Sequence, residues 1–331
     1  MTDVVALAAE LLAIDSSSGS ESGVVDFVSK WLVARGWNVH LQEVTRGRAN
    51  IWASRAGHGV TLSTHLDTVP PYFGPRLEGD KLFGRGACDA KGIAAAMLVA
   101  ADRLAASGEQ RVDLLFVVGE EKGSDGARSA NRLKPTSKFL VNGEPTESKL
   151  ASGAKGSLRV TVRTSGRAAH SAYAHLGESA LTPMLALLPT LDSLELPTDD
   201  VLGNTTFNIG TLHAGNEANI VPASAEAEIM FRLVGDVKPL KRDVEKWARG
   251  RAEIEFGSYI PAQHFHTIPG FEVAPVAYTS DIPLLGRWGT PLLFGPGSIH
   301  VAHTPNECID VKELRAAVRA YETIVRSLLA S

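Results

Sequence analysis

The stretch STHLDTVPPYFGPRLEGDKLFGRGACDAKG, residues 63–92, decides the fold. A short β-type run precedes His65, and the Ala-rich segment Ile93–Leu104 carries apolar residues at helical spacing. His65 and Asp67 are therefore expected where a strand ends, and Asp89 just before a helix begins. Ligands of open α/β sheets bind at the carboxyl ends of the strands. Two acids and an imidazole at such a place are costly to bury alone and indicate a divalent metal ion.

Outward from this stretch, strands alternate with helices. Further strands are predicted at residues 112–118 and 139–141, and each leads into acidic residues. Such alternation predicts an α/β fold with a mostly parallel sheet covered by helices on both faces. Further on, the order strand–helix–strand–strand–helix–strand predicts a ferredoxin-like α+β unit. We therefore expect a catalytic domain at residues 1–152 and 262–331 and an inserted domain at residues 153–261.

Composition restricts the class of protein. The chain has 331 residues, of which 44% are hydrophobic and 21% charged, so it is globular rather than disordered. A net charge of −4 without a long basic run argues against a nucleic-acid partner. Two cysteines without a CxxC pair favour a reducing compartment. No segment has the length and apolarity of a membrane span, and we expect a soluble, cytoplasmic protein.

Candidate metal ligands end or follow the predicted strands: His65, Asp89, Glu121, Glu144 and His303. Imidazole and carboxylate together suit zinc, and also cobalt or manganese. Five ligands exceed the need of one catalytic zinc, but with one bridging carboxylate they serve two ions with room for water. Glu120 adjoins a ligand, where a carboxylate can take the proton of that water as general base. Asp67 is expected to contact the imidazole of His65 and thereby fix its tautomer.

Five segments, HLDTVP, GRGACDAKG, GEEKGSDGA, NGEP and HTPNE, together resemble the co-catalytic zinc peptidase and deacylase family. That family includes acetylornithine deacetylase, succinyl-diaminopimelate desuccinylase, aminoacylase and glutamate carboxypeptidase. The resemblance spans nearly the whole chain and implies a dinuclear zinc centre, with Glu120 as general base and a lid and dimerisation domain in the insertion. The ligand sets that it implies are His65, Asp89 and Glu144 for one zinc ion, and Asp89, Glu121 and His303 for the other.

The inserted domain carries further resemblances. The segment GRAAHS resembles the family segment whose histidine polarises the scissile carbonyl, often across a dimer, which implies this role for His170; His175 is the alternative. NEANIVP implies that Asn219 binds substrate. EIMFR implies that Arg232 grips a substrate carboxylate, a task that suits a guanidinium fork.

One more segment outside the insertion completes the expected site. GPGS resembles a backbone loop of the family that lies against the substrate, which implies that Gly297 and Ser298 contribute to binding. The reaction implied is hydrolysis of the amide bond of a small N-acyl amino acid, on the acetylornithine deacetylase and succinyl-diaminopimelate desuccinylase side of the family. A homodimer formed through the lid is also implied.

Several alternatives stay open at this point. The protein could be a dipeptidase or carboxypeptidase, or could release lysine or ornithine from an amino-group carrier protein. A catalytically silent binding homologue is a different class, against which the intact Glu120 and all five ligands argue. The lid could also dimerise while each site is completed within one chain.

Overall fold

The structure, a computed structural model, describes residues 2–57 and 59–330 and divides into two compact units. The first unit lies within Met1–Ser152, Phe265–Ala274 and Ser280–Ser331, and the second is formed by Gly153–His264 and Pro275–Thr279. These limits fall close to the domain boundaries expected from the sequence. One difference is the segment Pro275–Thr279, which packs with the second unit although the sequence analysis assigns it to the first.

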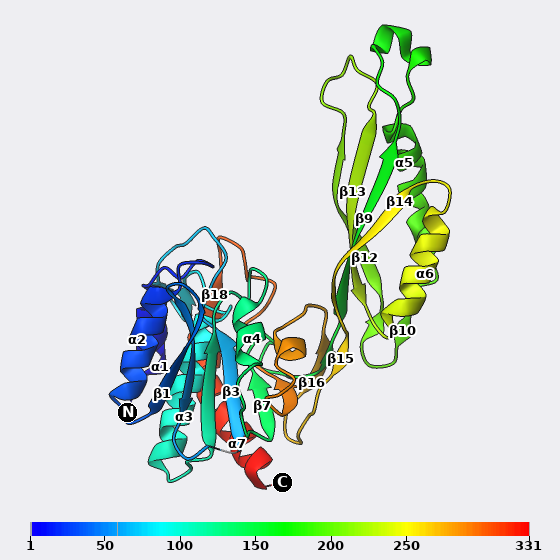
Figure 1. Cartoon of the computed structure of the whole chain (residues 1–331). Helices are drawn as coiled ribbons and strands as arrows, with labels where there is room; N and C mark the ends of the chain where they lie inside the picture. The colour runs from blue at the N-terminus through cyan, green and yellow to red at the C-terminus, as the bar shows by residue number, and fades with distance from the viewer. Residues whose placement is uncertain (1, 58, 331) are drawn as a thin grey trace. The chain divides into compact units, whose positions relative to one another are not determined.

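A six-stranded sheet forms the centre of the first unit, in the order β1-β2-β6-β3-β7-β17 (Figure 1). Its strands are β1 (Asn38–Thr45), β2 (Arg48–Ser54), β3 (Val60–His65), β6 (Val112–Val117), β7 (Phe139–Asn142) and β17 (Thr290–Leu293). The last four strands in the spatial order are parallel, and β1 and β2 add an antiparallel edge. The predicted mostly parallel α/β sheet is thereby confirmed. Because β3 lies between β6 and β7, the carboxyl ends of these three strands are neighbours.

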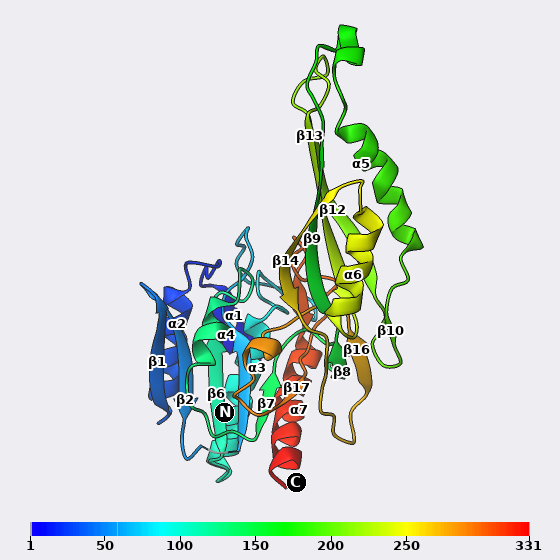
Figure 2. The same ribbon diagram turned by 45° about the vertical axis from the view of Figure 1, so that its right-hand side comes forward.

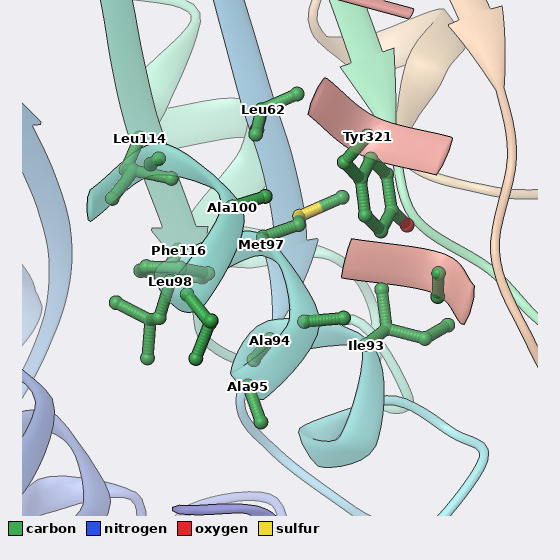
Figure 3. Packing of buried hydrophobic residues seen from close by; sticks show 14 of the residues in the cluster. Leu62, Ile93, Ala94, Ala95, Met97, Leu98, Ala100, Leu114, Phe116 and Tyr321 are labelled. Carbon is green, nitrogen blue, oxygen red and sulfur yellow. The ribbon is translucent and has the colours of Figure 1, made fainter. Parts of the chain in front are cut away.

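Helices cover both faces of this sheet. They are α1 (Val4–Leu12), α2 (Ser22–Val33), α3 (Lys91–Ala106), α4 (Asp125–Ala130) and α7 (Val311–Ala330). Alternate residues of β6 enter two different cores, since side chains alternate across a strand. Leu114 and Phe116 pack with α1, α3 and α7, including Met97 and Tyr321 (Figure 3), whereas Leu115 and Val117 pack with α4 and Trp288. The sheet is thus buried on both faces, as a parallel sheet requires.

A small sheet joins two distant parts of the first unit. Its order is β18-β5-β4, with β4 (Arg76–Glu78), β5 (Lys81–Phe83) and β18 (Cys308–Asp310). Cys308 pairs with Phe83, so that the segments around Gly84 and Glu307 run side by side.

The second unit has the ferredoxin-like order of strands. Its sheet β12-β13-β9-β14 is antiparallel throughout and consists of β9 (Gly156–Ser165), β12 (Thr206–Ala214), β13 (Ser224–Leu233) and β14 (Glu253–Ile260). The helices α5 (Leu181–Leu187) and α6 (Val237–Ala248) lie along one face of it (Figure 2). The first helical segment of the insertion, expected from the sequence as one helix, is divided into α5 and the 3-10 helix η2 (Leu188–Ser193). Pro189 explains the division, because proline has no N–H for an α-helical hydrogen bond.

Short elements complete the described chain. They are η1 (Ser171–Leu176), β10 (Thr198–Asp199), β11 (Gly203–Asn204), β8 (Leu150–Ala154), β15 (Gln263–His264), β16 (Val273–Val276) and η3 (Ile282–Leu284). Among the described residues, no helix has both the length and the apolarity needed to cross a membrane.

Candidate metal centre

His65 is the last residue of β3, and the centre is built around its imidazole. The side chain is 1% exposed, and its Nδ1 lies 2.9 Å from the main-chain oxygen of Asp67. That carbonyl can only accept, so Nδ1 carries the proton and the lone pair of Nε2 is left for a ligand. Nε2 lies 2.9 Å from Oδ1 of Asp89, which precedes α3. The strand end and the helix start therefore meet as the sequence predicted.

Asp89 and Glu121 are joined by a histidine from the C-terminal part of the chain. Nε2 of His303 lies 3.2 Å from Oδ2 of Asp89 and 3.0 Å from Oε1 of Glu121. Asp89 thus faces His65 with one oxygen and His303 with the other. This is the arrangement expected of a carboxylate that bridges two ions.

The donor atoms fit metal ions in type and spacing. One ligand atom each from His65, Asp89 and Glu121 lies within 4.8 Å of the others. Two atoms bound to one tetrahedral zinc ion lie about 3.3–3.6 Å apart, because each bond is about 2.0–2.2 Å long. The contacts of 2.9–3.2 Å described above are slightly shorter, so small side-chain shifts accommodate an ion. Imidazole and carboxylate ligands on a rigid strand edge are suited to zinc, cobalt or manganese.

Excess negative charge also favours cations at this place. Glu144 follows β7 and is 5% exposed. Burial raises the pKa of Glu144 well above its usual value; His65 opposes this shift, while Glu120, Asp89 and Asp281 add to it. Carboxyl groups that resist ionisation because of burial and each other become stable carboxylates when a cation joins them.

Glu120 lies in the turn after β6, beside the candidate ligand Glu121. Burial raises the pKa of Glu120 well above its usual value, and Asp281 makes the largest contribution among the neighbouring acids. A carboxylate with a raised pKa is a stronger base, as a proton acceptor near neutral pH needs to be.

Asp67 acts on this turn more than on the imidazole. Its carboxylate lies 3.5 Å from Nδ1 of His65, farther than the main-chain oxygen of the same residue. It accepts hydrogen bonds from the main-chain N–H groups of Glu120 and Glu121, at 3.0 and 3.1 Å, and from Oγ of Ser18 at 2.7 Å. Asp67 therefore positions both glutamates through their backbone, and its main chain rather than its carboxylate fixes the histidine tautomer.

The loop that carries Gly297 and Ser298 lies against the turn that carries Asp89. A Cβ on Gly297 would lie 2.6 Å from Cβ of Cys88, and Gly297 has a φ of +87°, so this close approach requires glycine. The N–H of Gly297 donates to Glu313 at 2.8 Å and the hydroxyl of Ser298 to Glu147 at 3.1 Å. Both groups already have partners within the first unit, and a contact with substrate remains a prediction.

The second unit holds the remaining predicted residues, at two opposite ends of its sheet. His170 is exposed and lies beyond the end of β9, and its Nδ1 accepts a hydrogen bond from the N–H of Ala172 at 3.1 Å. Asn219 is exposed beside it, since its main-chain oxygen accepts from the N–H of Ser171 at 2.8 Å. His175 is also exposed and packs its ring edge against Tyr173.

Arg232 lies near the other end of the same sheet. It pairs with Ser157 at the start of β9, whereas Ser224 pairs with Ser165 at the end of that strand. Eight residues of strand at about 3.3 Å each separate the two places by about 26 Å. Within the described chain, the Arg232 guanidinium has no hydrogen bond or ion pair, and burial lowers its pKa. A half-buried, unpaired guanidinium is suited to binding an anion.

Two buried acids that the sequence analysis did not single out also belong to the centre. Asp281 is 1% exposed, and neither of its carboxylate oxygens has a hydrogen bond of good geometry among the described residues. Glu307 is fully buried next to the Asp89 turn. Glu307 lies in the quoted segment HTPNE, which is the one signal that could have drawn attention to it.

The fold and the site together define a class. A metal-dependent hydrolase typically has imidazoles and carboxylates grouped in one site, with a further glutamate beside them. Here these side chains lie at the carboxyl edge of a parallel sheet. Residues 61–327 match the Peptidase family M20/M25/M40, and the chain belongs to this family. The resemblance seen in the sequence motifs is thereby confirmed, and the protein is a hydrolase of C–N bonds.

Relatives in sequence carry peptidase names. A "Peptidase M20 domain-containing protein" of Schizosaccharomyces pombe is 38% identical over 336 residues, which cover 98% of this chain and 84% of the relative. A "Probable carboxypeptidase" of Aspergillus flavus is 37% identical over 370 residues, which cover 97% of this chain and 86% of the relative.

Solved structures share the fold at lower identity. A tripeptidase from Staphylococcus aureus has a TM-score of 0.83 at 20% identity and covers 99% of this chain and 98% of its own. An M20 family metallo-carboxypeptidase from Sulfolobus solfataricus has a TM-score of 0.79 at 20% identity, with full coverage of both chains. A Bacillus subtilis protein described as a dinuclear metal binding peptidase has a TM-score of 0.73 at 14% identity and covers 99% and 98%.

Proposed function

We propose that the protein hydrolyses the amide bond that precedes a free amino-acid carboxylate, with two zinc ions as cofactors. The substrate that we favour is a small N-acyl amino acid. The observation that carries the proposal is the group of buried His65 and Asp89 with Glu121, which His303 extends with contacts of 3.0 and 3.2 Å. Cobalt or manganese suits the same donors.

The ligand assignment follows the contacts of each side chain. Asp89 faces His65 and His303 with different oxygens, which supports its role as the bridge. Glu144 would complete the site on the His65 side, and Glu121 the site on the His303 side. When bound, the ions lower the pKa of a water molecule and polarise the scissile carbonyl.

Glu120 would move the proton in this reaction. Its N–H donates to the carboxylate of Asp67, and among the described residues its own carboxylate makes no hydrogen bond to His65 or His303. Its raised pKa suits a group that accepts a proton from the attacking water and passes it to the leaving amine nitrogen.

His170 would stabilise the negative oxygen that develops on the carbonyl. Its Nδ1 accepts a hydrogen bond from Ala172, so the proton of the neutral ring lies on Nε2. An exposed Nε2–H is a donor available to a substrate, and Asn219 would contribute beside it. Arg232 would hold the carboxylate of the substrate with its unpaired guanidinium.

The length of the lid sheet supports the proposal of a homodimer through the lid. Within one unit, Arg232 lies about 26 Å from the end of β9, as estimated from the strand rise, and His170 lies beyond that end; no small substrate spans that distance. If both contact one substrate, they come from different subunits. The largely exposed edge strand β12 offers main-chain groups to a second copy.

A dipeptidase or carboxypeptidase is the second candidate, and the names of the relatives favour it. Arg232 serves both candidates equally, because a peptide C-terminus and an N-acyl amino acid present the same carboxylate. A bulkier substrate, such as lysine or ornithine linked to a carrier protein, is a third candidate.

Amine release from a panel of substrates tests the proposal. The panel holds N-acetylornithine, N-succinyl-diaminopimelate, other N-acetyl amino acids and several dipeptides, with added zinc or cobalt and an EDTA control. EDTA-sensitive turnover of an acyl amino acid is expected. Turnover of dipeptides alone would assign the protein to the second candidate. Absence of bound metal in the active preparation would contradict the mechanism.

A further inference from the structure

A buried carboxylate lies behind the turn that carries Asp89. Oε1 of Glu307 accepts hydrogen bonds from the main-chain N–H groups of Gly86 at 2.9 Å and Asp89 at 3.2 Å. The N–H of Cys88 points to the same oxygen at 3.4 Å. Nη1 of Arg85 donates to Oε2 at 2.6 Å. Every group that faces Glu307 in these contacts is therefore a donor.

This turn is shaped to enclose an anion. Several main-chain N–H groups that converge on one point form an anion-binding nest, and here the anion is a side chain of the protein itself. Gly86 has a φ of +95°, which lets its N–H turn inward. Arg85 and Glu307 are 1% and 0% exposed, so the pair is shielded from water. A buried pair of this kind is costly unless all its hydrogen bonds are made.

The same segment also carries a candidate metal ligand. Glu307 follows His303 by four residues, and the pairing of β18 with β5 brings this segment to the Asp89 turn. Glu307 and Asp89 are 218 residues apart in the sequence. One short segment therefore presents the imidazole of His303 and fixes the backbone of Asp89, whose carboxylate that imidazole contacts.

We propose that Glu307 is a positioning residue for the metal centre, which clamps the Asp89 turn to the His303 segment so that both ligands meet at one ion. The inference rests on the proposed dinuclear centre. Glu307 contacts the N–H of Asp89 and not its carboxylate, so it acts through the ligand and does not bind metal itself.

The clamp matters more for one ion than for the other. The site on the His303 side depends on two ligands that Glu307 holds together. The site on the His65 side shares Asp89 with it, but retains His65, the last residue of β3, and Glu144, two residues after the end of β7. Loss of the clamp should therefore weaken the His303 side first.

Glu307→Gln tests the hydrogen bonds that Glu307 accepts, because the amide NH₂ of the glutamine must face a group that is itself a donor. Groups that support a metal ligand from behind contribute about 10–100-fold to metal affinity. Arg85→Met is the matched comparison: it breaks the same ion pair and leaves the N–H groups on Oε1 intact. Glu322→Gln on α7 is a control for the substitution itself.

The experiment is titration of the metal-free proteins with Co²⁺, followed by the visible absorption of the bound ion and by calorimetry. The parent protein is expected to bind two ions. Glu307→Gln is expected to bind the first ion nearly as the parent does and the second about 10–100-fold more weakly. Arg85→Met should keep affinities near those of the parent, even if its melting temperature falls. Glu322→Gln should match the parent.

Two outcomes would overturn the inference: Glu307→Gln binds both ions with parental affinity, or Glu307→Gln and Arg85→Met weaken binding equally, as an ion pair that only stabilises the fold would predict. If the parent itself binds no metal, the proposed function fails, and the inference fails with it. Should Glu307→Gln not fold, as judged by circular dichroism, Glu307→Asp takes its place. That variant keeps the charge but is one methylene too short to reach Arg85 and the turn together, and the same loss at the second site is expected.

Discussion

Single buried carboxylates determine how the site residues are held. Asp67 binds the backbone of Glu120 and Glu121, and Glu307 binds the backbone of Asp89. In both cases a carboxylate accepts main-chain N–H groups, which are rigid donors and leave little freedom to the next side chain. The candidate ligands and the candidate base are thus positioned through their backbones, and their own carboxylates stay available for chemistry.

Substitution of Glu120 tests the proposed separation of proton transfer from metal binding. Glu120→Gln keeps the size of the side chain and removes its basicity, so we expect amide hydrolysis to fall about 10²–10⁴-fold. Metal content should stay at the level of the parent, since Glu121 and not Glu120 contacts His303. Glu121→Gln is the contrasting variant and should lose metal as well as activity. Activity measurements beside metal analysis check both, and parental activity in Glu120→Gln would show that another group is the base.

Asp281 is expected to destabilise the metal-free protein at neutral pH. Burial raises its pKa from 3.8 to about 6; Ser124, His65 and Arg128 oppose the shift, and Asp67 adds to it. Below about pH 4 the group is protonated in both the folded and the unfolded state. Between pH 4 and 6 the folded state holds the proton longer, so stability falls as pH rises, and above pH 6 the full penalty remains.

Asp281→Asn should therefore raise the free energy of unfolding at pH 7.5 by about 1–3 kcal/mol, and by much less at pH 4. Urea unfolding of EDTA-treated parent and variant at the two pH values measures the difference. Asp243→Asn, at an exposed position of α6, is the control and should change little at either pH. Equal effects of Asp281→Asn at both pH values would show that ionisation of this group is not the cause.

At the scale of elements, the connection from β6 to α4 presents both glutamates. Gly119 opens this connection with a φ of +74°. Arg48, at the start of β2, pairs with Asp125 of α4 at 2.6 Å and with buried Glu21 before α2 at 2.7 Å. Three elements are therefore tied together directly behind Gly119.

Gly119→Ala should disturb this connection more than Gly123→Ala, which lies in the same loop. A Cβ on Gly119 would lie 2.1 Å from Oδ1 of Asp125 and 2.5 Å from Nη2 of Arg48, whereas Gly123 has open space. Both positions have a positive φ, so alanine costs about 1–2 kcal/mol at either one. Gly119→Ala should lose more stability and roughly tenfold or more in activity, because Glu120 moves with the loop. Thermal unfolding and turnover are measured for both variants. Equal losses would show that the Arg48–Asp125 ion pair moves aside without a cost in stability.

At the scale of the whole molecule, metal removal tests the charge balance of the first unit. Asp67, Asp89 and Glu144 are buried within one region, and ions bound there stabilise only the folded state. Free metal at 1,000 times its Kd stabilises by about 4 kcal/mol, which corresponds to a rise of about 8–16 °C in Tm at ~2–4 °C per kcal/mol. Scanning calorimetry with EDTA and with restored zinc measures the change. An unchanged Tm would argue against ions at this place.

Mixing of two inactive variants tests the proposed dimer. Glu120→Gln lacks the base and His170→Ala lacks the lid histidine. If His170 acts across the dimer, a mixed dimer contains one site with both groups intact, and activity returns on subunit exchange. Gel filtration checks that a dimer is present. Dimers that exchange subunits without recovering activity would place His170 in the site of its own chain.

The sequence by itself determined the strand ends, the five candidate ligands and the family, because alternating strands and helices and the residues that follow them are local features. It also predicted the ferredoxin-like insertion, although not the division of its first helix at Pro189. Only the tertiary structure assigned partners to Glu307, revealed that Asp281 is buried beside the centre, and revealed that Asp67 accepts hydrogen bonds from the backbone of the two glutamates. The contacts of Asp67 with the glutamates and of Glu307 with its partners join residues from 53 to 222 positions apart, and the pairing of β18 with β5 that creates the longest of them has no local signature. The opposite places of His170 and Arg232 were likewise decided by strand register, since hydrogen bonding between distant strands fixes which ends of the sheet they occupy.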